Sequence, residues 1–254
     1  MSKKPQSKIK VKDDNENINF YELAECKVFG TKYNNPSYSL EKMPFKHPFR
    51  ACLVGASGSG KSNVLLNLIS KLNGTFNKIL IFTQDKNEQL YNFLESKIDK
   101  PFLEIYEGID AFNNYEIQKE LDEKNMQTLI IFDDMCIETK KKQQKIQELF
   151  IRGRKMCGQG LSICYLSQSF VDTPILIRKQ ATHFILKKVN GGMDLRRILK
   201  DCSIEANGKQ LESMYNYCVS SADNIIDFLL IDRTATEAMR FRKNYSKILN
   251  PADF

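Results

Sequence analysis

The chain has 254 residues, of which 42% are hydrophobic and 27% are charged, and this ordinary globular composition excludes wholesale disorder. No uninterrupted apolar stretch reaches the roughly 18–20 residues of a membrane-spanning helix, so we expect no membrane partner. The formal net charge of +7 permits a polyanionic partner without requiring one.

Cysteine usage indicates the compartment. The seven cysteines form an odd set without a C-x-x-C pair, which argues against a disulfide scaffold and against a structural zinc site. A reducing compartment is the natural environment for such a chain, and we expect a cytoplasmic protein.

The amino-terminal region differs in composition from the rest. Residues 1–19 are rich in Lys, Asn, Asp and Ser with almost no apolar content, which is typical of a disordered tail. Residues 20–44 carry aromatic and aliphatic side chains without a clear period, and two prolines interrupt them. The sequence therefore predicts a disordered tail and an extended arm over residues 1–44, and one folded domain over residues 45–254.

From Phe49 onward, short apolar runs alternate with segments of helical period. Several runs are apolar at consecutive positions, as in Leu129–Phe132, and strands that are buried on both faces have this pattern. We predict strands over residues 49–54, 78–82, 102–106, 128–132, 161–166, 182–189 and 225–231, and helices over residues 61–72, 86–98, 113–122, 140–156, 174–180 and 192–218. This alternation predicts an α/β fold with three layers and a mostly parallel central sheet.

A glycine-rich segment follows the first predicted strand. Residues 55–62, Gly-Ala-Ser-Gly-Ser-Gly-Lys-Ser, fit the pattern G-x-x-x-x-G-K-[ST] between a strand and a helix, which is the context that a phosphate-binding loop needs. The glycines let backbone N–H groups surround phosphate oxygens at the positive end of the following helix. Lys61 would reach the outer phosphates, and the Ser62 hydroxyl would hold Mg²⁺. We therefore predict that ATP and Mg²⁺ bind at Gly55, Ala56, Ser57, Gly58, Ser59, Gly60, Lys61 and Ser62.

Two carboxylates end the predicted strand over residues 128–132. Asp133 and Asp134 would lie at the carboxyl end of a buried strand, where ligands bind in open α/β sheets. Asp133 would coordinate Mg²⁺ through water and complete the metal site that Ser62 begins. Asp134 is then the candidate general base for an attacking water, although solvated turn acids would show the same pattern.

Polar residues on either side of the next strand complete the candidate catalytic set. Gln168 follows the strand over residues 161–166, and it would sense the γ-phosphate or position water if that strand neighbours the one that carries the acids. Arg152 and Arg154 precede the same strand, and one of them would act as an arginine finger in trans across a subunit interface. We favour Arg154, because Gly153 would let the chain turn outward; a solvated or DNA-facing arginine is the alternative.

Basic residues are concentrated in two stretches. Residues 140–157 contain seven Lys or Arg against one acid, and residues 178–200 contain seven against one acid. Solvated helical faces would account for either stretch alone, but two such stretches around one strand favour a basic surface. We expect this surface to bind double-stranded DNA without sequence preference.

Together these motifs resemble a known family. The GASGSGKS loop, the LIIFDDM segment and the Gly-Arg-Lys segment that leads into a strand ending in Ser-Gln are similar to those of FtsK/HerA-type P-loop ATPases. Within this group the chain looks most like the DNA-packaging ATPases of large DNA viruses of eukaryotes and their virophages. Residues 238–245 of this chain also resemble the C-terminal part of those viral proteins. The resemblance covers about residues 45–248.

The resemblance implies a three-layer P-loop NTPase domain of the RecA-like (ASCE) class. It also implies an ATP-hydrolysing, ring-forming motor that drives double-stranded DNA into a capsid, with capsid proteins as further candidate partners. For a viral chain the compartment would be the virus factory of the host cell, or the virion. Many relatives have Glu after the metal-binding Asp, whereas Asp134 is one methylene shorter, so the resemblance supports the metal ligand Asp133 more firmly than the base.

Two other interpretations remain open from the sequence. Another P-loop NTPase, such as an AAA+ helicase loader or a small-molecule kinase, would share the loop and the acids. A loader would carry a C-terminal helical lid, where this chain has a strand-like run over residues 225–231, and a kinase would need an acceptor pocket. A non-hydrolysing, nucleotide-gated module that binds DNA or capsid is supported only by Asp134 in place of Glu.

Overall fold

The computed structural model describes residues 33–113, 115–202, 206–220 and 225–254. The predicted tail, and the part of the predicted arm up to residue 32, lie outside the described residues. In the described part none of the helices combines the length and apolar character needed to cross a membrane.

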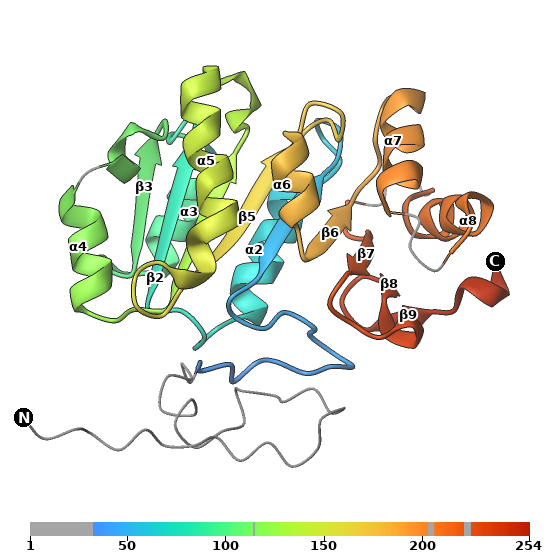
Figure 1. The fold of residues 1–254 in the computed structure, drawn as a ribbon, viewed down its shortest axis with the longest axis horizontal. Coiled ribbons are helices and arrows are strands. Elements are labelled where there is room, and N and C mark those ends of the chain that lie inside the picture. The colour runs from blue at the N-terminus through green and yellow to red at the C-terminus, as the bar shows by residue number, and fades with distance from the viewer. Residues whose placement is uncertain (1–32, 114, 203–205, 221–224) are drawn as a thin grey trace, which may run out of the picture. The chain divides into compact units, whose positions relative to one another are not determined.

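A single mixed sheet forms the centre of the described chain, in the order β3-β2-β4-β5-β1-β6-β7-β8-β9 (Figure 1). The first six strands in this order are mutually parallel, and the last three pair antiparallel. The mostly parallel sheet is thereby confirmed, and β5 lies between β4 and β1, next to the acid-bearing strand. The strands are β1 Arg50–Val54, β2 Lys78–Thr83, β3 Leu103–Glu107, β4 Thr128–Asp133, β5 Leu161–Ser167, β6 His183–Leu186, β7 Leu229–Asp232, β8 Phe241–Lys243 and β9 Lys247–Leu249.

Helices cover both faces of the parallel strands, which gives the three layers (Figure 1). The helices α4, α5 and α6 lie over the face toward the viewer, and α2 and α3 lie behind the sheet. The helices are α2 Lys61–Lys71, α3 Gln89–Lys97, α4 Tyr115–Glu123, α5 Lys140–Arg152, α6 Ile175–Gln180, α7 Gly192–Cys202 and α8 Gly208–Val219.

Two details of the predicted elements were wrong. The single helix predicted over residues 192–218 is two helices, and the Asn207 side chain begins the second by accepting hydrogen bonds from the N–H groups of Lys209 and Gln210. The strands β8 and β9 were not predicted, because three residues each are too few to show a period of two.

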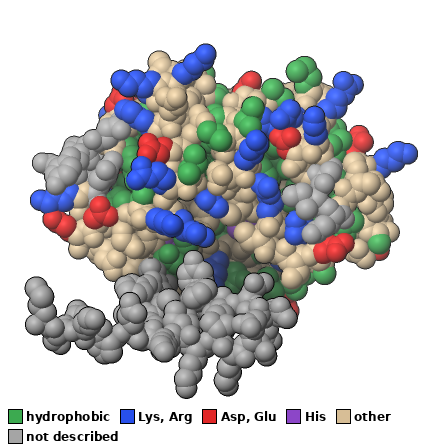
Figure 2. Space-filling view, viewed as in Figure 1, with side chains coloured by type: hydrophobic (Ala, Val, Ile, Leu, Met, Phe, Trp, Pro, Cys, Tyr) green, Lys and Arg blue, Asp and Glu red, His purple; other side chains and the backbone are tan. Residues whose placement is uncertain are grey.

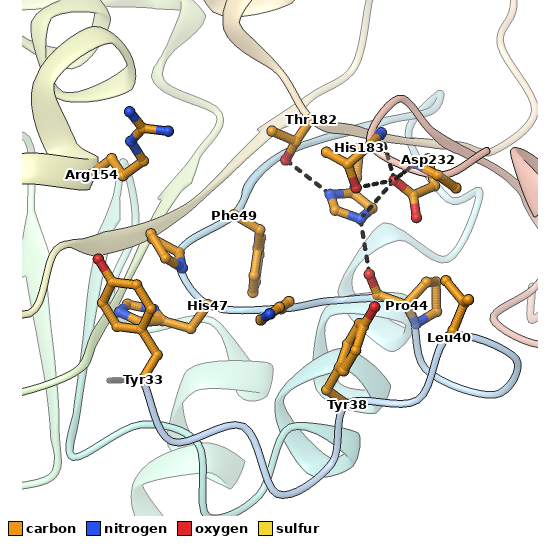
Figure 3. Close-up of a pocket in the computed structure, with 14 residues that line it drawn as sticks. Tyr33, Tyr38, Leu40, Pro44, His47, Phe49, Arg154, Thr182, His183 and Asp232 are labelled. Carbon is orange, nitrogen blue, oxygen red and sulfur yellow. Dashed lines mark hydrogen bonds and ion pairs between the residues drawn. The ribbon is translucent and has the colours of Figure 1, made fainter. Parts of the chain in front are cut away.

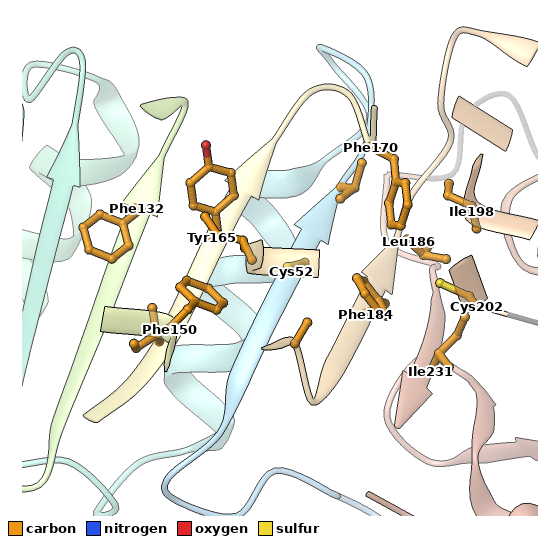
Figure 4. Close-up of a cluster of buried hydrophobic side chains, with 14 of the residues drawn as sticks. Cys52, Phe132, Phe150, Tyr165, Phe170, Phe184, Leu186, Ile198, Cys202 and Ile231 are labelled. Carbon is orange, nitrogen blue, oxygen red and sulfur yellow. The ribbon is translucent and has the colours of Figure 1, made fainter. Parts of the chain in front are cut away.

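The buried side chains form one cluster on each side of the sheet, which explains the consecutive apolar runs. Along β1, Cys52 and Val54 point into the cluster under α5, α6 and α7, whereas Ala51 and Leu53 point into the cluster under α2 and α3. Figure 4 shows the first cluster, where Phe150 of α5 meets Tyr165 of β5. The six cysteines within the described part are free thiols.

Part of the predicted arm packs against the domain. The backbone N–H of Asn34 donates to the Gln127 side-chain oxygen at 2.6 Å, and the Gln127 amide donates back to the Asn34 carbonyl at 2.9 Å. Met43 and Phe45 are buried in the cluster under α2. Residues 33–44 are therefore held along the amino-terminal edge of the strands.

The two basic stretches reach the surface unequally. Lys140 and Lys141 are exposed at the start of α5, and Figure 2 shows Lys and Arg side chains spread across the face that α5 and α6 cover. In the stretch 178–200, however, Arg178 is buried in an ion pair with Asp201, and Lys187 is buried as well. This second stretch therefore contributes fewer surface charges than its sequence predicts.

Candidate nucleotide-binding site

The strand register brings the predicted site residues to one edge of the sheet. Leu166 of β5 pairs with Leu53 of β1 on one side and with Asp133 of β4 on the other. The residues that follow these three positions therefore leave the sheet together, at the carboxyl ends of the parallel strands. The predicted phosphate loop, the two acids and Gln168 all belong to these segments.

The loop at residues 55–62 has the backbone that a phosphate cradle needs. Gly58 and Gly60 have left-handed φ angles of 73° and 89°, which glycine adopts without steric cost. A Cβ atom on Gly60 would also lie 2.2 Å from the carbonyl oxygen of Ile225, so this position has no room for a side chain. The helix α2 begins directly at Lys61, which places its positive end against the loop.

The Lys61 ammonium lies over the loop and faces the acids. Its Nζ donates to the carbonyl oxygens of Gly55 at 2.8 Å and Ala56 at 3.3 Å. Burial lowers the pKa of Lys61, while the negative charges of Asp134 and Asp133 act in the opposite direction. The Lys61 ammonium is therefore close enough to both carboxylates for their charges to interact.

Asp133 is buried, and a residue that the sequence analysis missed holds it. The Tyr91 hydroxyl on α3 donates to Oδ2 of Asp133. Burial raises the pKa of Asp133, and the Tyr91 hydrogen bond and the Lys61 charge oppose that shift. Tyr91 fixes the orientation of the carboxylate, and nothing in the sequence around a tyrosine in a helical segment signals this role.

Only one of the two carboxylate oxygens of Asp134 has a hydrogen-bond partner among the described residues. It has a left-handed backbone, with φ 51°, and its Oδ2 accepts a hydrogen bond from Nε2 of Gln168 at 2.9 Å. Its Oδ1 is buried and has no hydrogen-bond partner among the described residues, and the same holds for the Ser59 hydroxyl in the loop. The predicted base and the predicted sensor are therefore in direct contact, with one carboxylate oxygen left for a ligand.

These groups fit a magnesium ion held together with a nucleotide. Mg²⁺ prefers oxygen ligands and is bound in proteins through one or two side chains plus water and substrate phosphates. Ser62 and the buried Asp133 supply such oxygens at the edge where phosphates would lie. Within the described ranges there is no group of three or more His, Cys, Asp or Glu that could hold a metal by itself, so the phosphates would supply the remaining ligands.

Two further charged residues border the site without having been predicted. Glu88 precedes α3, and burial together with the charges of Asp133 and Asp134 raises its pKa. Lys187 follows β6, and its Cβ lies 2.4 Å from the position that a Cβ on Gly55 would occupy. Burial lowers the pKa of Lys187 to about 8. A charged residue directly after a buried strand, at the same edge as the phosphate loop, was the available signal for Lys187.

The predicted arginines lie at the opposite edge of the sheet. Arg152 ends α5 and pairs with Glu148 at 2.6 Å, and both side chains are exposed. Arg154 is also exposed, and it borders a cavity of about 390 Å³ at the amino-terminal edge of the strands (Figure 3). Gly153 does not turn the chain outward as expected: it keeps a helical backbone and packs closely on Ile163 of β5.

The arrangement of the chain is similar to that of several solved ATPases. The genome packaging NTPase B204 from Sulfolobus turreted icosahedral virus 2, solved in complex with ATP-gammaS, is 18% identical with a TM-score of 0.55, over 81% of this chain and 100% of that chain. EssC (ATPases 2 and 3) from Geobacillus thermodenitrificans is 12% identical with a TM-score of 0.53, over 81% of this chain and 40% of that chain. At these identities the likeness establishes the fold, and it confirms the predicted three-layer α/β architecture.

Sequence comparison gives the family. The DNA packaging protein OPG160 of Monkeypox virus is 27% identical over 216 residues, which is 80% of this chain and 68% of that protein. The protein of the same name from Vaccinia virus (strain Copenhagen) is 28% identical over 206 residues, or 76% of this chain and 72% of that protein. The family described as Poxvirus A32 protein matches residues 37–241. The chain therefore belongs to the poxvirus A32 protein family.

Proposed function

We propose that this protein is an ATP-hydrolysing motor that translocates double-stranded DNA and packages a viral genome into its capsid. The observation that carries the proposal is the meeting of Lys61, Asp134 and Gln168 at one edge of the sheet, in a chain whose relatives are named as DNA packaging proteins. The antiparallel strands β7–β9 stand where an AAA+ loader would have a helical lid, which supports packaging over that alternative.

The residues of the site divide the work of hydrolysis. Lys61 and the loop N–H groups bind the phosphates, and Ser62 and Asp133 would hold Mg²⁺, which neutralises charge on the phosphates when bound. Asp134 accepts the proton of the attacking water at its unpartnered Oδ1. Gln168 orients the Asp134 carboxylate by donating a hydrogen bond to its Oδ2. Because Gln168 directly follows β5, loss of the γ-phosphate would be transmitted through it to this strand.

An arginine from a neighbouring subunit completes the site. Arg154 precedes β5 and Gln168 follows it, so the seven residues of β5 separate their backbones by about 20 Å at roughly 3.3 Å per residue. A side chain cannot cross that distance, so an Arg154 that contacts a γ-phosphate would contact that of an adjacent copy. This geometry supports assembly into a homo-oligomeric ring, with the amino-terminal edge of one subunit facing the nucleotide of the next.

The basic surface is the proposed contact with DNA. Lysines of α5 lie on the face shown in Figure 2, and the charges of exposed lysines attract the phosphate backbone without reading bases. Binding is therefore independent of sequence and falls steeply with salt. Capsid proteins are further partners, and the virus factory or the virion is the proposed location.

Steady-state ATP turnover with and without duplex DNA tests the function. A packaging motor couples hydrolysis to its track, so turnover increases when duplex DNA of any sequence is added at low salt, and the increase disappears as salt rises. A small-molecule kinase would ignore DNA, and a non-hydrolysing module would show no turnover. Either of those results would remove the proposal.

A further inference from the structure

The turn that follows β5 is anchored by an acid from a distant helix. Asp194 lies in the first turn of α7 and is the one acid in the basic stretch over residues 178–200. Its Oδ1 accepts a hydrogen bond from the Ser169 hydroxyl at 3.0 Å and another from the Val171 N–H at 2.8 Å. Asp194 is only 9% exposed. A buried carboxylate therefore joins α7 to the residues that come directly after Gln168.

The other hydrogen bonds of Ser169 are local. Its carbonyl accepts from the Ser167 hydroxyl at 2.8 Å, and its own hydroxyl accepts from the Asp172 N–H at 3.2 Å. Such bonds between close neighbours shape the turn, but they do not fix its position against the rest of the domain. The bond from the Ser169 hydroxyl to Asp194 does so, because it spans 25 positions of the sequence.

Gln168 lies between this anchored turn and the end of the strand. Ser167, the residue before it, still belongs to β5, and its carbonyl accepts from the Gly55 N–H at 3.1 Å, at the start of the phosphate loop. The backbone of Gln168 is thus held by the phosphate loop on one side and through Asp194 on the other. From this position the exposed Gln168 side chain reaches Asp134 at 2.9 Å.

We propose that Asp194 is a positioning residue for ATP hydrolysis, which acts through Ser169 to hold Gln168 against Asp134. The inference rests on the proposed function, in which Asp134 takes the proton of the attacking water. Hydrolysis depends on such placement, because moving a group by about 1 Å can lower a rate by about 10²-fold. Both donors bond to the same oxygen of Asp194, so the role requires an acceptor and not a negative charge.

Steady-state kinetics of two Asp194 variants test this role. Asp194→Ala removes the acceptor, so kcat for ATP falls by about 10–100-fold, while KM stays within about twofold because the phosphate loop is unchanged. Asp194→Asn keeps an amide oxygen that can accept both bonds, and it recovers at least about half of the parent kcat. The matched control Asn207→Ala removes the N-cap of the next helix, α8, lowers stability and keeps the parent kinetics.

A double-mutant cycle tests the route through Gln168. Gln168→Ala alone lowers kcat, because Asp134 loses the side chain that orients it. Adding Asp194→Ala to Gln168→Ala lowers kcat by less than about twofold further, since the group that Asp194 positions is already gone. A merely structural role of Asp194 would instead multiply the two losses.

A second variant approaches the same contact from the turn. Ser169→Ala removes the donor and lowers kcat by at least about threefold, so the test does not depend on whether Asp194→Ala folds. The turn remains seated in this variant, because Phe170 is buried with its ring centroid 5.6 Å from that of Phe184 (Figure 4).

The outcomes separate this inference from the function on which it rests. A parent protein without ATP turnover would overturn the proposed function. If the parent protein hydrolyses ATP, the positioning role is wrong when Ser169→Ala or a folded Asp194→Ala keeps the parent kcat. It is equally wrong when Asp194→Asn is as slow as Asp194→Ala, or when the losses of Asp194→Ala and Gln168→Ala multiply.

Discussion

The two edges of the parallel sheet carry aspartates in opposite states of hydrogen bonding. At the amino-terminal edge, Oδ1 of Asp232 accepts hydrogen bonds from the Thr234 N–H at 2.8 Å, the Thr234 hydroxyl at 2.6 Å and the Ala235 N–H at 3.2 Å. At the carboxyl edge, Asp134 accepts one hydrogen bond from Gln168, and its Oδ1 has no partner among the described residues. A carboxylate whose bonds are filled internally stabilises the fold, whereas one with a buried open oxygen is available to a ligand.

The basic groups at the two edges differ in the same way. His47 contacts the Ser162 hydroxyl at 2.7 Å and the Gln159 carbonyl at 3.0 Å, and burial lowers the pKa of His47. Burial also lowers the pKa of His183, which lies 3.4 Å from Asp232 (Figure 3). These imidazoles are structural. Within the described residues, by contrast, Lys61 at the other edge donates hydrogen bonds only to carbonyl oxygens of its own loop. At the carboxyl edge the fold leaves the buried Oδ1 of Asp134 without a hydrogen-bond partner among the described residues, next to the proposed phosphate loop.

The largest expected loss of ATP turnover comes from removing Lys61 at the carboxyl edge of the sheet. Lys61→Ala leaves the phosphate charge uncompensated, so it weakens nucleotide binding strongly and abolishes detectable ATP turnover. Nucleotide titration and steady-state turnover measure both losses. The control Lys97→Ala removes an exposed lysine at the end of α3 and keeps parent activity. An active Lys61→Ala protein would show that the loop does not bind the phosphates.

The next largest loss of ATP turnover is expected for Arg154, which lies at the amino-terminal edge of one subunit and is proposed to act at the carboxyl edge of its neighbour. Arg154→Ala lowers turnover by roughly 10³–10⁵-fold, the range for an arginine finger, while the oligomer persists. Mixing Arg154→Ala subunits with Lys61→Ala subunits restores activity, because each mixed interface then joins an intact loop to an intact arginine. The control Arg152→Ala removes only the exposed pair with Glu148 and stays active. A fully active, oligomeric Arg154→Ala protein would place the finger elsewhere.

A smaller loss separates chemistry from binding within the carboxyl edge. Asp134→Asn cannot accept the proton of water, so turnover falls by about 10²–10⁴-fold while MgATP still binds. Rapid-quench turnover together with calorimetric binding distinguishes the two. Asp99→Asn, at an exposed position far from the loop, serves as the control. Turnover of Asp134→Asn at the parent rate would reassign the base, and Glu88 would then be the next carboxylate to test.

The smallest effect on catalysis comes from the amino-terminal edge. Asp232→Ala leaves several donors without an acceptor and lowers the free energy of unfolding by about 3 kcal/mol. Turnover per folded molecule stays at the parent value, since Asp232 contacts no residue of the site. Urea unfolding and turnover at low temperature measure the two quantities, with exposed Asp253→Ala as control. A loss of turnover without a loss of stability would contradict the structural role of this edge.

The sequence predicted the shared position of the loop, both acids and Gln168 better than it predicted the strands near the C-terminus. The loop, both acids and Gln168 follow strands at their carboxyl ends, so a correct strand assignment was enough to bring them together. Tyr91 could not be predicted, because its role depends on how α3 packs against β4. The antiparallel pairing of β8 and β9 likewise could not be predicted, because these strands are too short to be recognised.

Charge patterning was the least reliable guide. Arg178 and Lys187 counted toward a basic surface in the sequence, but one is buried in an ion pair with Asp201 and the other donates from the interior to the Asp227 carbonyl at 2.7 Å. Counting charges along a chain cannot distinguish a solvated lysine from a buried one that has found a partner.

Displacement of a third strand from a triplex at one end of a duplex tests the central claim of a DNA motor most directly. The parent protein displaces the third strand from duplexes of unrelated sequence when ATP and Mg²⁺ are present, and Lys61→Ala displaces none. If the parent protein hydrolyses ATP but never displaces the strand, and its turnover is the same with and without duplex DNA, the protein is an ATPase without translocation and the account is wrong.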